Sequence, residues 1–143
     1  MTIATVLCPV DFSEATAPLV AYAAALAAGT HAELRLLHVL EPQPVLENLP
    51  DLALAQQLAH YHALATAAGA RVSTAVVHAP DVAQAIVAEA RRHPADLIVI
   101  GAHGRTGLNR FLMGSTAETV VRTASCVTLL VKSPVDTSYR ASA

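Results

Sequence analysis

One stretch of this chain decides how it folds, and it reads Asp96-Leu-Ile-Val-Ile-Gly101-Ala-His-Gly104-Arg-Thr-Gly107-Leu-Asn-Arg-Phe-Leu-Met-Gly114-Ser115-Thr116-Ala-Glu118. It begins with an apolar run of strand length and continues through a glycine-containing loop. Ser115 and Glu118 have the spacing of a capping box, which predicts that a helix begins at Ser115. A helix N-terminus presents unpaired N–H donors and a positive dipole end, so it suits a phosphate. An alternative without a ligand explains these residues equally well: the glycines would only shape a turn, and the serine would only cap a helix.

Four more apolar runs have strand length and lack clean alternation: Ile3 to Val10, Leu34 to Val39, Val72 to Val77 and Val127 to Val131. Such runs are typical of strands buried on both faces of a sheet. The segments between the strands have helical spacing. We expect helices over residues 17–28, with Gly29 as the stop, over about 50–68, with Gly69 as the stop, and over 82–92.

The alternation of strand and helix predicts an α/β fold, a single doubly wound five-stranded parallel sheet with helices on both faces. The 143 residues have room for one domain. We expect it to span residues 1–132, followed by a flexible tail over 133–143. A strand order of 3-2-1-4-5 would bring the ends of the first and fourth strands, Asp11 and Gly101, into one crevice. Ligands of doubly wound sheets bind at such a switch point.

Composition and charge argue against several classes of protein. Nine Lys and Arg against eleven Asp and Glu give a formal net charge of −2, so the electrostatic attraction that drives nucleic-acid binding has no obvious source. The longest apolar helix candidate, residues 17–28, is too short to span a membrane and contains Pro18. The first apolar run lacks the basic leader of a signal peptide. The two cysteines form no metal or disulfide pattern, which favours reduced thiols in a cytoplasmic protein.

Other kinds of site fit these residues less well. His60 and His62 point to different faces of a helix, and His38 and His78 end neighbouring strands, but structural histidines are expected rather than a metal site. A phosphoacceptor receiver domain would need paired acidic residues after the first strand, where this chain has Asp11 alone. No G-x-G-x-x-G follows the first strand, and the sequence has no Walker lysine.

The spacing Gly101-x2-Gly104-x9-Gly114-Ser115 resembles the G-x2-G-x9-G-[S/T] pattern of the ATP-binding branch of the universal stress proteins. The similarity extends over essentially the whole chain. It includes the stretches Val6-Leu-Cys-Pro-Val-Asp11-Phe-Ser13, Leu36-Leu-His38-Val39 and Val127-Thr-Leu-Leu-Val-Lys132. One departure is Ala79, where many members have glycine, and it lies away from the glycine loop.

This resemblance implies a site for ATP with Mg²⁺, formed by Pro9, Val10, Asp11, Val39, Gly101, His103, Gly104, Arg105, Gly114, Ser115 and Thr116. The glycines and the two hydroxyl residues would surround the triphosphate, and Val39 would line the adenine slot. Asp11 would lie near the ribose or the phosphates and hold the metal, although it could instead only start the first helix together with Ser13. His103 is singled out because its backbone can face the ligand. Arg105 could screen phosphate charge or be simply solvated.

The function implied by the resemblance is an ATP-binding stress-response or regulatory module that acts as a nucleotide-dependent switch. A slow ATPase is a second possible function, ranked lower because no evident base is present to activate water. A dimeric interaction protein that binds no nucleotide is a third. Similar proteins pair their last strands antiparallel across a two-fold axis, which implies a homodimer through the fifth strand. That apolar strand should lie at a sheet edge, where Lys132 alone would discourage pairing with another strand. The alternative is that the tail from Ser133 folds over this edge.

Overall fold

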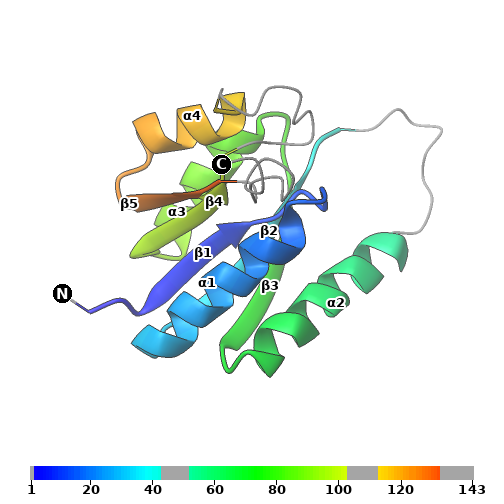
Figure 1. The fold of residues 1–143 in the computed structure, drawn as a ribbon. Helices are drawn as coiled ribbons and strands as arrows, with labels where there is room; N and C mark the ends of the chain where they lie inside the picture. The colour runs from blue at the N-terminus through cyan, green and yellow to red at the C-terminus, as the bar shows by residue number, and fades with distance from the viewer. Residues whose placement is uncertain (1, 43–51, 103–112, 133–143) are drawn as a thin grey trace, which may run out of the picture.

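The computed structural model describes residues 2–42, 52–102 and 113–132. These residues form strands and helices in strict alternation (Figure 1). In chain order they are β1 (Thr5–Pro9), α1 (Thr16–Thr30), β2 (Glu33–Leu40), α2 (Leu52–Ala67), β3 (Arg71–His78), α3 (Val82–Arg92), β4 (Leu97–Gly101), α4 (Ser115–Thr123) and β5 (Val127–Val131). None of the helices in these ranges has the length and apolar character that crossing a membrane requires.

The strands form one parallel sheet in the order β3-β2-β1-β4-β5, which confirms the predicted topology. β1 and β4 therefore lie side by side at the centre of the sheet. Asp96, just before β4, joins their starts, because its carboxylate accepts hydrogen bonds from the backbone N–H groups of Ala4 (2.8 Å) and Thr5 (3.0 Å). This pairing places the carboxyl ends of β1 and β4 next to each other, at the switch point of the sheet.

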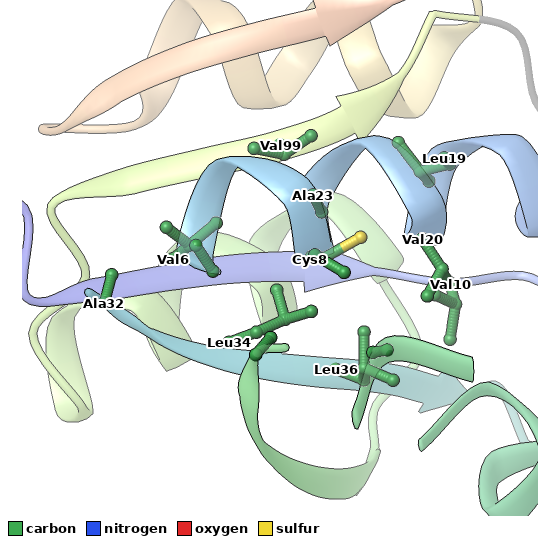
Figure 2. Close-up of a cluster of buried hydrophobic side chains, with 14 of the residues drawn as sticks. Val6, Cys8, Val10, Leu19, Val20, Ala23, Ala32, Leu34, Leu36 and Val99 are labelled. Atoms are coloured by element: carbon green, nitrogen blue, oxygen red, sulfur yellow. The ribbon is translucent and has the colours of Figure 1, made fainter. Parts of the chain in front are cut away.

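Helices cover both faces of the sheet, and each face has its own apolar core. Val6 and Cys8 of β1 pack under α1 (Figure 2). Leu7, between them, belongs to the other cluster, which includes residues of α3 and α4. This is why the central strands read as continuous apolar runs. Both cysteines are free. Burial raises the pKa of the Cys8 thiol to about 12, so this thiol stays protonated and unreactive at neutral pH.

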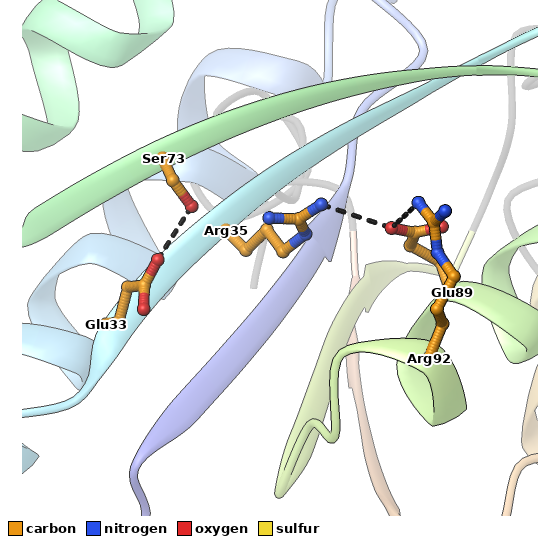
Figure 3. A network of polar contacts seen from close by, with 5 residues as sticks. All are labelled: Glu33, Arg35, Ser73, Glu89 and Arg92. Atoms are coloured by element: carbon orange, nitrogen blue, oxygen red, sulfur yellow. Dashed lines mark hydrogen bonds and ion pairs between the residues drawn. The ribbon is translucent and has the colours of Figure 1, made fainter.

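A buried carboxylate is the main polar feature of the face under α3 (Figure 3). Glu89 of α3 is only 4% exposed, and its Oε1 accepts hydrogen bonds from Arg35 of β2 (3.1 Å) and Arg92 (2.9 Å). Burial disfavours the charged form of Glu89, but the hydrogen bonds and charges of Arg92 and Arg35 outweigh it and hold the pKa of the carboxyl below its ordinary value. Nothing in the local sequence around residue 89 predicts this burial.

Two local predictions are wrong. Helix α1 does not stop at Gly29 but continues through Thr30 and ends at His31, which adopts a left-handed conformation with φ of 60°. The backbone N–H of His31 bonds to the carbonyls of Ala27 and Ala28, so an ordinary residue provides the C-cap that glycine usually provides. The expectation that all five strands are buried on both faces also fails. β3 and β5 are the sheet edges, and Val76 (38%) and Val127 (54%) are substantially exposed.

Candidate functional site

A cavity of about 400 Å³ lies at the carboxyl ends of β1, β2 and β4, between the start of α3 and the start of α4. Its described wall consists of Pro9, Val10, Asp11, Leu37, His38, Val39, Leu40, Glu41, Val82, Ile86, Ile100, Gly101, Gly114, Ser115, Thr116 and Ala117. Its position is the switch point of the sheet, where doubly wound domains bind ligands.

Eight of the eleven predicted site residues line this one cavity: Pro9, Val10, Asp11, Val39, Gly101, Gly114, Ser115 and Thr116. The other three, His103, Gly104 and Arg105, lie outside the described residues. The structure thus brings residues from four separate segments to one wall, and their roles toward a ligand stay predictions. Sequence reasoning missed the contribution of α3, where Val82 and Ile86 stand one helical turn apart and face the cavity.

The first turn of α4 forms one end of the cavity. The helix begins at Ser115 as predicted, but its N-cap is Gly114, with φ of −63° and ψ of 151°, and no side chain caps it. The predicted capping box is therefore wrong. Glu118 instead pairs with Arg122 one turn later, at 3.2 Å. The N–H of Glu118 makes the first helical bond, to the carbonyl of Gly114 at 2.9 Å, so the N–H groups of Ser115, Thr116 and Ala117 have no acceptor within the helix.

Asp11 organises the start of α1, which was one of its two predicted roles, and its role toward a ligand stays a prediction. Its Oδ1 accepts hydrogen bonds from the Ser13 N–H (3.0 Å) and the Thr16 hydroxyl (3.3 Å), which organises the chain ahead of α1. The same residue lines the cavity. Within residues 2–42, 52–102 and 113–132, no three His, Cys, Asp or Glu side chains are grouped to hold a metal ion. Among the described residues, no group of ligands accompanies Asp11, so a cation there would need ligands from elsewhere, such as a bound molecule or water.

His38 forms part of the cavity wall and is a structural histidine. It is buried, and its Nδ1 lies 2.8 Å from the carbonyl oxygen of Val10. A carbonyl can only accept, so Nδ1 carries the proton in this bond. His78 does not approach it across the ladder, because the residue opposite His78 is Leu40. The two histidines are thus not directly opposite each other in the ladder, and His38 is the structural histidine that was expected.

Part of the cavity wall is apolar. Val39 packs against the core cluster that contains Ile86 and Ile100, and all three residues line the cavity. The wall therefore offers aliphatic surface as well as the backbone N–H donors and hydroxyl groups of the first turn of α4. An elongated ligand with an apolar ring system at one end and an anionic group at the other would match both.

The fold is a doubly wound α/β domain with a cavity at its switch point, where domains of this class bind ligands. The chain belongs to the universal stress protein family, whose model matches residues 2–132. A universal stress protein of Methanocaldococcus jannaschii, MJ0531, is 52% identical over 52 residues, and the match spans 36% of this chain and about a third (31%) of that protein's length.

Many solved structures share the fold, and two of them are complexes with nucleotides. A universal stress protein in complex with cAMP is 24% identical with a TM-score of 0.78, and the match covers 94% of this chain and 100% of that one. The universal stress protein of Archaeoglobus fulgidus in complex with dAMP is 23% identical with a TM-score of 0.73, covering 92% of this chain and 100% of that one.

Proposed function

We propose that the cavity binds an adenine nucleotide, ATP together with Mg²⁺, and that the protein acts as a nucleotide-dependent switch in a stress response. One observation carries this proposal. Asp11 at the end of β1, Gly101 at the end of β4 and the first turn of α4 all line one cavity. The related structures with cAMP and dAMP support an adenine nucleotide as the ligand class.

In the proposed complex, the base lies against Val39 and the aliphatic part of the cavity wall, and the phosphates approach the N–H groups of the first turn of α4. A phosphate at a helix N-terminus gains charge-assisted hydrogen bonds and a favourable interaction with the helix dipole. The hydroxyl groups of Ser115 and Thr116 supply further donors.

The charges on the cavity wall support a cation in the complex. The described lining residues include two carboxylates, Asp11 and Glu41, and neither lysine nor arginine. A triphosphate beside two carboxylates is unfavourable unless its charge is screened. Mg²⁺ commonly binds one or two carboxylates plus phosphate oxygens, so Asp11 fits a metal that arrives with the nucleotide and neutralises it.

The proposal is tested by titrating the purified chain with ATP in a calorimeter, with and without Mg²⁺, and by measuring phosphate release. We expect saturable binding that weakens when Mg²⁺ is removed. We expect turnover far below the roughly 1–100 s⁻¹ of kinases, because the sequence has no Walker lysine and no evident base to activate water. Absence of ATP binding would contradict the proposal, and brisk Mg²⁺-dependent hydrolysis would make the protein an ATPase.

We also propose that β5 pairs with β5 of a second copy. β5 is an edge strand of aliphatic residues, and its first residue, Val127, is 54% exposed. Light scattering is expected to give a dimer mass at micromolar concentration. Val127→Asp should dissociate it, because the pairing would bury an unpartnered charge on an apolar edge strand. The matched control Val76→Asp, on the opposite edge strand β3, should remain dimeric. A monomeric mass for the unmodified chain would contradict the dimer.

A further inference from the structure

Phe12 has an unusual backbone conformation for a bulky residue. Its φ is 61°, in the left-handed region that residues other than glycine rarely adopt. It directly follows Val10 and Asp11, which line the cavity, but it is not itself part of the described wall. A strained conformation persists only where surrounding contacts hold it, and such residues concentrate at binding sites.

Two ring contacts hold Phe12. The centroid of its ring lies 4.4 Å from that of His38, with 31° between the planes, and 6.0 Å from that of Tyr61, with 13° between the planes. Aromatic rings attract one another at such separations. His38 is fixed in turn by its hydrogen bond to the Val10 carbonyl. The row His38–Phe12–Tyr61 therefore connects the cavity wall to helix α2, which carries Tyr61.

Helix α2 contributes none of the described lining residues, but through Tyr61 it contacts the turn that lines the cavity. Among the described residues of this helix, only Leu58 and Ala65 are buried. An element with so few buried side chains shifts at low cost in free energy. Because Tyr61 contacts Phe12, a shift of α2 alters the support of the turn that presents Asp11 and Val10 to the cavity.

We propose that Phe12 and Tyr61 are positioning residues, which hold the turn of residues 10–13 against the cavity so that the ring contact between Tyr61 of α2 and Phe12 sets nucleotide affinity. This inference rests on the nucleotide site proposed above. In the conformation seen in the structure, the Asp11 carboxylate accepts a hydrogen bond from the Ser13 N–H, and the Val10 carbonyl accepts one from His38. Without the Tyr61 ring, Phe12 keeps only its ring contact with His38, and the turn samples other conformations. The apparent affinity for the nucleotide then falls in proportion to the fraction of molecules whose turn is in the binding conformation.

The variant Tyr61→Leu, in the full chain, tests the inference because it keeps an apolar side chain and removes the ring. We expect ATP with Mg²⁺ to bind about threefold to tenfold more weakly, the factor that one aromatic pair is worth. In the nucleotide-free protein, hydrogen exchange of the Ser13 amide, which is bonded to Asp11, should accelerate by a similar factor. Tyr61→Phe, which keeps the ring, should retain both values of the unmodified chain.

Leu64→Ala is the matched control, because Leu64 is a partly buried residue of the same helix that packs on the same core. It should lower stability and leave both the affinity and the Ser13 exchange unchanged. Unchanged Ser13 exchange or unchanged affinity in Tyr61→Leu, or equal changes in Leu64→Ala, would overturn the inference. If the proposed nucleotide site is wrong, the unmodified chain binds no ATP. The difference in Ser13 exchange between Tyr61→Leu and Leu64→Ala would still be present in that case.

Discussion

Replacing Gly114 with valine is expected to weaken ATP binding by about tenfold to a hundredfold, the loss of one or two hydrogen bonds to a charged group. Gly114 lines the cavity directly before the first turn of α4. A branched side chain there occupies space through which a phosphate must approach the backbone N–H groups of that turn. Isothermal titration calorimetry measures the change directly.

The backbone of Gly114 does not itself require glycine. Its φ of −63° and ψ of 151° are accessible to any residue, so Gly114→Val should remain folded with a loss of about 1 kcal/mol from the poorer N-cap. Gly29→Ala is the matched control, because Gly29 lies within α1 and an added Cβ there meets nothing within 4 Å. It should bind ATP as the unmodified chain does. Retained affinity in a folded Gly114→Val protein would show that phosphate binds elsewhere.

Replacing Glu89 with alanine is expected to have the largest effect on stability, a loss of about 3 kcal/mol in the free energy of unfolding. The side chain of Arg35, 15% exposed, would lose its carboxylate partner, whereas Arg92 is 69% exposed and can be solvated. A charge left buried without its partner is costly. Urea denaturation monitored by circular dichroism gives the difference.

The control for Glu89 is Glu118→Ala. Glu118 is also a helix residue paired with an arginine, at 3.2 Å, but both side chains are more than half exposed. Pairs of this kind contribute about 0.5 kcal/mol or less. Similar losses for the two variants would mean that burial does not set the strength of the Glu89 network.

The Glu89 network also predicts a dependence of stability on pH. The pKa of Glu89 is lower in the folded protein than its ordinary value, so the folded state binds fewer protons at this carboxyl than the unfolded state. The contribution is present above the unfolded pKa, about 4.3 for glutamate, and is lost as pH falls through the folded pKa. Denaturation curves for the unmodified chain and Glu89→Ala should therefore converge in acid. A difference that stays constant below pH 4 would contradict this assignment.

Short-range signals determined most of the secondary structure. Helix α3 has the predicted bounds, 82–92, because Asp81 caps it by accepting the Gln84 N–H at 3.0 Å. Gly69, which follows α2, has a φ of 97° and so adopts the left-handed conformation that favours glycine. Apolar runs marked all five strands. In the central strands, alternate residues face two separate cores, so both sets must be apolar, whereas the edge strands β3 and β5 are partly exposed.

The fold class, the element order and eight described residues of the candidate cavity could be predicted from composition, local spacing and a family pattern. Three other features could not be predicted. Val82 and Ile86 complete the cavity, Glu89 is buried against Arg35, 54 positions away, and Phe12 is held between His38 and Tyr61. These features arise from contacts between segments that are distant in the chain, and the residues around each position do not carry the free energy of such contacts.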